Sequence, residues 1–346
     1  MTIAGVIKKR DLFLDIAKGL AIILVVIGHV IQGSSEHFDD LMGFKMIYSF
    51  HMPLFIFLSG AVAAISFDAK VATRGLRPAV LMAWGKIQKA FFRLLIPFIA
   101  WCVLNQLIFH HANSVWSALV LAFRRPDTAL WFLLAVFYCV ALTGLFQILF
   151  ALILWALEYF RMRRDRVWKI FSSPIFQVAL MILIWWSIKD HTPYGAGLAL
   201  LKPYFIYYAL GLGFYKFTQG QFPIGYSILG GVVFFMLVPF WARTAQFQYV
   251  GPIVLPDTGL YFYAGILAIS GIWIFLGCAK MITLSKVGFL KNFLILCGQL
   301  SLGIYAIHYF FLAYSPKILV PLCVSLLISY LLNKIPVIRT LFLGER

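Results

Sequence analysis

Long apolar runs alternate with short polar segments along the whole chain, and this pattern predicts membrane-spanning helices. A span needs about 20 apolar residues, because an α-helix rises about 1.5 Å per residue and the hydrocarbon layer is about 30 Å thick. Ten runs meet or approach this length, at residues 12–31, 47–67, 93–110, 129–152, 175–188, 203–217, 224–241, 259–279, 293–312 and 317–333. We therefore predict an all-α fold: a polytopic bundle of about ten transmembrane helices forming a single membrane domain, 1–346.

Individual runs refine this prediction. Those at 175–188 and 203–217 are short for a full crossing, whereas the run from Ala129 to Phe160 is long enough to continue as helix beyond the membrane. Cytoplasmic loops of membrane proteins are enriched in Lys and Arg. With both termini placed in the cytoplasm, most of the 29 basic residues face that side, so we predict cytoplasmic N- and C-termini.

Composition excludes two classes of protein. A chain that is 63% hydrophobic and 12% charged is too apolar for a soluble domain, so membrane lipids are expected partners. The net charge of +17 does not indicate nucleic acid, because membrane orientation explains basic residues that lie in the loops between apolar runs. The five cysteines show no C-x-x-C spacing and are interpreted as packing residues.

The first apolar run carries ionisable residues that a membrane helix normally lacks. Lys18 and His29 are eleven residues apart, which returns them to within roughly 20° of one helical face, with a rise of about 16 Å between them. Asp15 precedes Lys18 by three residues and can pair with it. These residues are therefore candidates for function, the alternative being that Asp15 and Lys18 reach water at the interface.

Further candidates stand at the ends of other runs. His51 opens the second run, and Trp131 opens the fourth. Tyr305 and His308 share one helical face with Ser301 in the ninth. The predicted topology places all of these near the outer surface. The alternatives are a belt tryptophan at Trp131 and a packing histidine at His308.

The outer histidines also raise the question of a metal. His29, His51 and His308 would suit zinc, but no carboxylate or cysteine is placed to complete or orient such a site. We therefore expect no metal.

A basic cluster precedes the third run. Lys86, Lys89 and Arg93 follow each other at steps of three and four residues, so one helical face at the cytoplasmic surface carries three cations. Membrane anchoring and binding to anionic lipid headgroups each explain such a cluster. A third interpretation is a site for the phosphates of coenzyme A.

Several of these segments resemble the acyltransferase-3 family of polytopic membrane O-acyltransferases, particularly members like fucose 4-O-acetylase and the Nod-factor acetylases. The resemblance is carried by Lys18-x10-His29, by Phe50-His51-Met52-Pro53-Leu54-Phe55 with Leu58-Ser59-Gly60, by Trp131-Phe132-Leu133, and by Ser301-Leu302-Gly303-Ile304-Tyr305-Ala306-Ile307-His308. It extends from near residue 10 to near residue 312 and is patchy between 140 and 290.

The resemblance implies a bacterial cytoplasmic (inner) membrane enzyme that moves an acyl group, most often acetyl, from cytoplasmic acyl-CoA to a hydroxyl at the outer face. The acceptor would be an envelope or secreted glycan or a lipid-linked saccharide. Acetyl-CoA would be the co-substrate, bound through Lys86, Lys89 and Arg93, where the family often has Arg-x-x-Arg. Lysine cannot make the bidentate arginine contact, so the residues that bind the phosphates differ in part from the family pattern.

A hydroxyl needs a base to attack a thioester, and histidine titrates in the right range. We expect His29 as that base, with Lys18 along the pantetheine channel and Asp15 tuning Lys18. His51, Trp131, Tyr305 and His308 would then bind or orient the acceptor. A transporter or exporter of a glycan or lipid-linked sugar is the alternative function, because transporters also keep ionisable residues inside the bundle. A non-catalytic subunit is a third.

Overall fold

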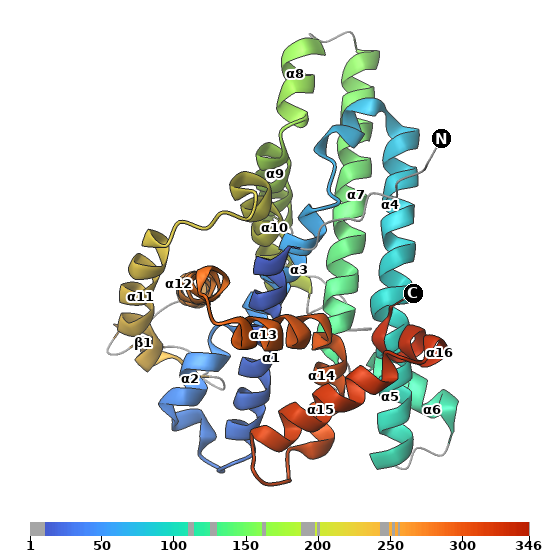
Figure 1. Cartoon of the computed structure of the whole chain (residues 1–346). Helices are drawn as coiled ribbons and strands as arrows, with labels where there is room; N and C mark the ends of the chain where they lie inside the picture. Colours follow the sequence, from blue (N-terminus) through green and yellow to red (C-terminus); the bar gives the residue numbers. More distant parts are fainter. Residues whose placement is uncertain are drawn as a thin grey trace. The chain divides into compact units, whose positions relative to one another are not determined.

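The computed structural model describes residues 11–109, 114–124, 130–160, 164–187, 198, 201–242, 249–250, 253–254 and 257–345. Helices joined by short loops make up this part of the chain, apart from one antiparallel pair of two-residue strands, β1 (Tyr249–Val250) and β2 (Ile253–Val254) (Figure 1). The predicted all-α class is therefore confirmed except for this strand pair.

The contacts of the chain group its residues into two compact units. The first unit combines Met1–Ser49 with Phe222–Ser301, and the second combines Phe50–Gln221 with Leu302–Arg346. Each unit is thus built from two separate stretches of sequence. A single membrane domain over 1–346 stays a prediction.

Helices of both stretches form the first unit, and the longest are α1 and α12. Its elements are α1 (Leu12–Gln32), η1 (Phe38–Asp40), α2 (Met42–Tyr48), α11 (Gly225–Leu237), η5 (Val238–Phe240), α12 (Asp257–Leu284) and α13 (Gly288–Gln299). The carboxylate of Asp11 accepts hydrogen bonds from the N–H groups of Phe13 and Leu14, at 3.0 and 3.2 Å. This N-cap satisfies donors that the first turn leaves unpaired, so it fixes the start of α1. The prediction for this helix, 12–31, is confirmed.

Two glycines bring α1 and α13 into direct backbone contact (Figure 1). A Cβ on Gly19 would lie 2.0 Å from the carbonyl oxygen of Leu294, and a Cβ on Gly298 would lie 2.0 Å from that of Asp15. No side chain fits at either position. Small residues allow membrane helices to approach in this way, and they set the position of α1 against α13.

Most of the remaining helices belong to the second unit. Its elements are α3 (His51–Ala64), η2 (Ala69–Arg74), α4 (Leu76–Ala90), the π-helical η3 (Phe91–Leu95), α5 (Ile96–Phe109), α6 (Val115–Arg124), α7 (Trp131–Tyr159), α8 (Arg164–Phe171), α9 (Pro174–Ser187), α10 (Leu201–Thr218), α14 (Ser301–Ile307), η6 (His308–Phe311), α15 (Leu319–Leu332), α16 (Pro336–Ile338) and the π-helical η7 (Arg339–Leu343).

The core of the second unit is aromatic. Phe146 and Phe150 of α7 pack there with Phe205 of α10, and α4 runs alongside α7 (Figure 1). Gly60 of α3 and Gly211 of α10 repeat the close packing seen in the first unit. A Cβ on either glycine would lie within about 2 Å of a carbonyl oxygen of the other helix.

Among the described residues, five helical segments are long and apolar enough to cross a membrane: Leu12–Gln32, Met42–Ala64, Leu76–Ile108, Trp131–Tyr159 and Gly259–Leu284. The number rises to seven if each of two bent helix pairs forms one span. Pro174–Ser187 and Gly225–Phe240 are apolar but shorter, so the structure does not confirm ten spans. The continuation of the fourth run as one long helix is confirmed, because α7 reaches Tyr159.

The third span starts earlier than the apolar pattern indicates. The helix begins at Leu76 instead of residue 93 and continues through η3 into α5. Apolar side chains of α4, such as Leu81 and Trp84, are exposed on its outer face. The charges of Lys86 and Lys89 lower the mean hydropathy of the segment and conceal that face in the sequence.

The predicted ninth span, 293–312, is not one helix. α13 ends at Gln299 and α14 begins at Ser301, so the helix is broken at Leu300. Leu300 stands between Gly298 and Ser301, and glycine and serine are residue types at which helices bend. Ser301 and Tyr305 thus lie on the short α14, and His308 opens the 3₁₀ turn that follows it.

Candidate functional site

Asp15 and Lys18 form an ion pair inside the first unit. Nζ of Lys18 lies 2.8 Å from Oδ1 of Asp15, and the two side chains are 26% and 10% exposed. Oδ2 of Asp15 is buried and has no hydrogen-bond partner within the part of the chain that the structure describes. Because Gly298 of α13 packs on the carbonyl of Asp15, the backbone that carries the pair is held in place by the α1–α13 contact. The predicted pairing is therefore present.

His29 lies farther along the same helix. α1 is unbroken from Leu12 to Gln32, so the common face predicted for Lys18 and His29 is maintained. The half-buried ring of His29 meets Tyr48 of α2 edge to face, with 6.2 Å between ring centroids. The hydroxyl of Tyr48 in turn donates to Oε1 of Gln32 at 2.5 Å.

α2 fits closely against the histidine end of α1. A Cβ on Gly28 would lie 3.0 Å from Cε2 of Tyr48, so this glycine makes room for the tyrosine ring. Phe44 stacks on the ring of Tyr48 with 3.9 Å between centroids. The tyrosine is thus fixed from several sides and can orient the imidazole of His29.

In the second unit, a path of aromatic rings connects three helices. Phe55 of α3 contacts Phe132 of α7 at 5.4 Å between centroids, and Phe132 contacts Tyr305 of α14 at 5.8 Å. Tyr305 then contacts His308 at 6.2 Å. His51 stands one turn before Phe55 at the start of α3 and is only 3% exposed. The structure therefore connects the regions of the predicted acceptor residues His51, Tyr305 and His308 within one unit.

His308 is completely buried, and its Nδ1 lies 2.9 Å from the carbonyl oxygen of Ile304. A carbonyl oxygen can only accept, so Nδ1 is the donor in this contact. Tyr309 packs against the imidazole with 4.4 Å between centroids. The tautomer and the position of His308 are therefore both set by the protein.

Trp131 starts α7 and is half-buried, with its ring 5.0 Å from that of Tyr204 in α10. A small cavity lies in the same unit, lined by Trp101, Cys102, Asn105, Leu130, Ala306, Tyr309 and Phe310. Its lining includes the neighbours of Trp131 and His308 in sequence. Its volume is about 30 Å³, which is room for a water molecule and far below the volume of a small-molecule site.

The three cations of the predicted donor site have different surroundings. Lys86 is half-buried, and its Nζ lies 5.2 Å from the centroid of the Phe67 ring. Lys89 is exposed at the end of α4, and Arg93 is exposed within η3. The π-helical turn of η3 separates Arg93 from the regular helix that carries the two lysines. The three cations therefore do not share the single helical face that their spacing predicted.

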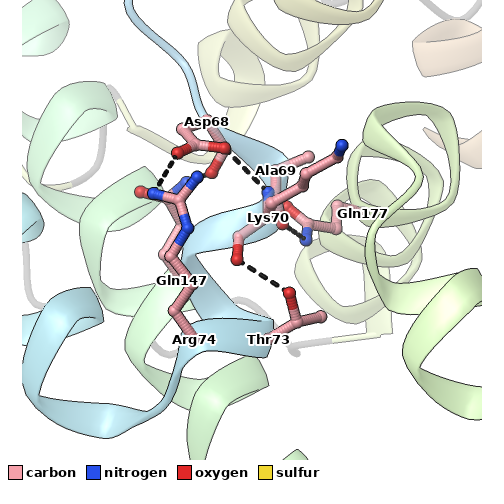
Figure 2. A network of polar contacts seen from close by, with 7 residues as sticks. All are labelled: Asp68, Ala69, Lys70, Thr73, Arg74, Gln147 and Gln177. Atoms are coloured by element: carbon pink, nitrogen blue, oxygen red, sulfur yellow. Dashed lines mark hydrogen bonds and ion pairs between the residues drawn. The ribbon is translucent and has the colours of Figure 1, made fainter.

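A polar network surrounds η2, the segment just before α4 (Figure 2). The carboxylate of Asp68 accepts from the backbone N–H of Lys70 at 2.9 Å and pairs with Arg74 at 2.9 Å. Both carboxylate oxygens of Asp68 are therefore engaged. Asp68 fixes the start of η2 and holds Arg74 beside it.

Two buried glutamines anchor the backbone of this segment. Gln147 of α7 donates to the carbonyl of Asp68 at 3.2 Å, and Gln177 of α9 donates to the carbonyl of Ala69 at 2.7 Å (Figure 2). Gln177 also donates to the carbonyl of Phe171. Both glutamine side chains are fully buried. These hydrogen bonds satisfy buried polar groups that have no water to bond to. They also tie η2 to two helices of the same unit.

Several side chains that lie beside the predicted site residues could not be identified from the sequence. Tyr48 and Gln32 beside His29 carry no motif, although Tyr48 stands close to His51 in the chain. Tyr204 beside Trp131 and the Asp68 network before α4 were also missed. Among the described residues, no group of three or more His, Cys, Asp or Glu side chains is arranged to hold a metal ion.

Comparison with known proteins gives four findings. The family described as "Acyltransferase domain" matches residues 11–341. The nodulation protein NolL of Sinorhizobium fredii is 35% identical over 158 residues, which are 43% of this chain and 40% of the relative. The NolL of Mesorhizobium japonicum is 36% identical over 101 residues, 28% of this chain and 24% of the relative. The matches thus span less than half the length of these relatives. No solved structure matches the chain.

Proposed function

Because this chain belongs to the acyltransferase domain family (acyltransferase-3), we propose that it is a membrane O-acyltransferase, and specifically an O-acetyltransferase. The acyl donor in this proposal is cytoplasmic acyl-CoA, chiefly acetyl-CoA. The acceptor is a hydroxyl of an envelope or secreted glycan at the outer face of the bacterial cytoplasmic membrane. The observation that supports the proposal most strongly is the Asp15–Lys18 ion pair on the helix that also carries His29.

In the proposed reaction, the acceptor oxygen attacks the thioester carbonyl, a new C–O bond forms, and the C–S bond breaks. A hydroxyl is a poor nucleophile at neutral pH, so a base must take its proton during the attack. We assign this role to His29, whose imidazole can then return the proton to the leaving thiolate. Tyr48 supports this assignment, since it packs on the ring and is itself held by Gln32.

Lys18 and Asp15 serve the donor in this proposal. A charge inside the apolar part of a membrane protein is costly and is usually retained for function. Asp15 offsets part of that cost by pairing with Lys18, while the partial exposure of Lys18 leaves the ammonium open to a polar ligand. We place Lys18 along the pantetheine arm, where it can also contact the thioester oxygen.

The acceptor is assigned to the second unit. Trp131 and Tyr305 offer aromatic surface, and His51 and His308 offer ring nitrogens that can orient a sugar hydroxyl or stabilise the thioester oxygen. The aromatic path from Phe55 to His308 supports a common location for these groups.

Lys86, Lys89 and Arg93 are assigned to the phosphates of the donor. Phosphate oxygens accept strong charge-assisted hydrogen bonds from ammonium and guanidinium groups. The two lysines contribute as point charges, and Arg93 alone can make a bidentate contact.

The test is mass spectrometry of envelope and secreted glycans from cells with and without this protein. Loss of one ester from the glycan, and its return with the intact gene, is the expected result. An unchanged ester pattern would contradict the proposal. Release of free coenzyme A from acetyl-CoA in isolated membranes supplied with glycan separates acyl transfer from glycan transport, because a transporter cleaves no thioester.

A further inference from the structure

Beyond α15 the chain turns back onto the region where α4 passes into α5. α16 and η7 leave the direction of α15 at an angle of 115°, and η7 contacts η3 and α5 of the same unit. The hydroxyl of Thr340 lies 3.0 Å from the carbonyl oxygens of Pro336 and Glu345. The N–H of Glu345 donates to the carbonyl of Arg339 at 3.3 Å. Residues 336–345 therefore form one compact turn, which we call the return segment.

Two consecutive residues anchor the return segment. Nε1 of Trp101 in α5 donates to the carbonyl oxygen of Phe342 at 2.8 Å, and the two rings meet edge to face with 5.0 Å between centroids. Leu343 is only 6% exposed. A Cβ on Gly303 of α14 would lie 2.8 Å from Cδ2 of Leu343, so this glycine makes room for the leucine. The return segment is thus fixed against both α5 and α14.

The next residue, Gly344, touches the backbone of Arg93. Its φ is +65°, in the left-handed region, and a Cβ there would lie 2.2 Å from the carbonyl oxygen of Arg93. Glycine is required for both reasons, because an L side chain disfavours this φ and would collide with the carbonyl. The return segment therefore meets η3 at one of the residues assigned to the phosphates of the donor.

The carbonyl of Arg93 lacks the partner that a regular helix would provide. In an α-helix it would accept from the N–H four residues later, but that residue is Pro97, which has no N–H. The chain forms the π-helical turn of η3 at this point. This turn sets the direction of the Cα–Cβ bond of Arg93. The contact with Gly344 fixes the turn from outside, at the carbonyl that the proline leaves without its helical bond.

The side chain of Arg93 remains available for a ligand. Within the described residues, its guanidinium makes no hydrogen bond or ion pair. Its backbone is held by the return segment, and a side chain on a fixed backbone loses less conformational entropy on binding. A guanidinium also needs a defined direction to contact a phosphate group through two N–H groups at once.

We propose that Gly344 is a positioning residue of the donor site, which acts through the backbone of Arg93 and aims its guanidinium at a phosphate group of coenzyme A. This inference rests on the proposed function and adds to it a residue from a segment far from η3 in the sequence. Gly344 makes no contact with the donor in this proposal. Trp101 has a supporting part, because it holds the return segment against α5.

The experiment measures binding of coenzyme A to the purified full chain by isothermal titration calorimetry. Gly344→Ala is expected to weaken the affinity by about tenfold, close to the effect of Arg93→Gln, since both remove one charge-assisted contact. In the Arg93→Gln protein, adding Gly344→Ala should weaken binding little further, because the side chain through which Gly344 acts is gone. A purely structural role would weaken binding by the same factor with and without the arginine.

Two further variants accompany this measurement, and thermal unfolding verifies the folding of each. Trp101→Phe keeps a ring against Phe342 and loses the N–H donor, so it should weaken binding by about two- to tenfold. It decides the question if Gly344→Ala does not fold. Gly85→Ala is the matched control, since a Cβ on this glycine of α4 meets no atom within 4 Å, and it should bind coenzyme A like the wild type.

Several results would overturn the inference. They are unchanged coenzyme A binding in a folded Gly344→Ala protein, an equal loss in Gly85→Ala, and a full further loss when Gly344→Ala is added to Arg93→Gln. If Gly344→Ala does not fold, unchanged binding in Trp101→Phe has the same consequence. In acyl transfer, Gly344→Ala should raise the KM for acetyl-CoA and leave kcat close to the wild-type value.

The binding results are separate from the proposed reaction. If Gly344→Ala weakens coenzyme A binding as expected but the wild-type protein transfers no acyl group, the proposed function fails and the positioning role stands. If the protein transfers acyl groups and a folded Gly344→Ala protein binds coenzyme A normally, only the inference fails. A wild-type protein that binds no coenzyme A would overturn both.

Discussion

In the first helix, the ammonium of Lys18 lies 2.8 Å from Oδ1 of Asp15, one helical turn away. The pair is mostly withdrawn from solvent, and the glycine contact between α1 and α13 fixes the backbone of Asp15. Removing one partner of such a pair leaves the other charge poorly compensated. This destabilises the protein more than replacing both partners by apolar residues does. The behaviour of Lys18 should therefore depend on Asp15.

Replacing Asp15 by Asn should lower acyl transfer by about 10- to 100-fold. The change removes one charge-assisted contact, worth about 1.5–3 kcal/mol, and releases Lys18 from its position. The measurement is the rate of coenzyme A release from acetyl-CoA by purified protein with acceptor. Asp40→Asn is the control, because Asp40 is an exposed acid of the same unit. Equal rates in Asp15→Asn and the wild type would show that Asp15 has no role in acyl transfer.

Replacing Gly298 by Ala should destabilise the first unit. The added Cβ would lie 2.0 Å from the carbonyl oxygen of Asp15, so α13 must move away from α1. Overpacking of this kind costs about 1–3 kcal/mol. We expect a lower midpoint of thermal unfolding in detergent and a parallel loss of activity.

Gly265→Ala provides the matched control for that variant. Gly265 lies inside α12, and a Cβ there meets no atom within 4 Å. Alanine favours helix over glycine, so the control should unfold at the same temperature as the wild type or slightly higher. A Gly298→Ala protein as stable as this control would contradict the close α1–α13 packing.

Replacing Gln177 by Leu should loosen η2. The change removes hydrogen bonds to the carbonyls of Ala69 and Phe171, which then remain buried without these donors. Such losses cost about 1–3 kcal/mol for each group. We expect a lower unfolding temperature and a higher KM for acetyl-CoA. Gln88→Leu, at an exposed position of α4, should change neither quantity. If Gln177→Leu lowers the unfolding temperature but leaves the KM for acetyl-CoA unchanged, η2 has no part in donor binding.

The extent to which the sequence predicted the fold differs between helices. α1 could be predicted closely because its apolar run is long enough for one crossing despite Asp15 and Lys18, and polar residues flank it. The break at Leu300 was not predicted, because the apolar run continues through it and Gly298 and Ser301 were its only local signal. The start of the third span was missed because the charges of α4 hide its apolar outer face.

The candidate site was predictable only where its residues share an element. Helical spacing was sufficient to place Asp15, Lys18 and His29 on one helix, and that part is confirmed. The hydrogen bonds from Gln147 and Gln177 join η2 to α7 and α9, which are far apart from it in the chain, so no local pattern could reveal them. The partner of His29, Tyr48, was missed for a related reason: its contact arises from the packing of α2 on α1.

The most direct test of the account is acyl transfer by purified His29→Ala protein in liposomes, with acetyl-CoA and glycan supplied. Loss of a general base lowers a rate by about 10²- to 10⁴-fold, so His29→Ala should release coenzyme A and form ester at least about 100 times more slowly than the wild type. His37→Ala, an exposed histidine of the same unit, should match the wild type. A folded His29→Ala protein that transfers acyl groups at the wild-type rate would contradict the account.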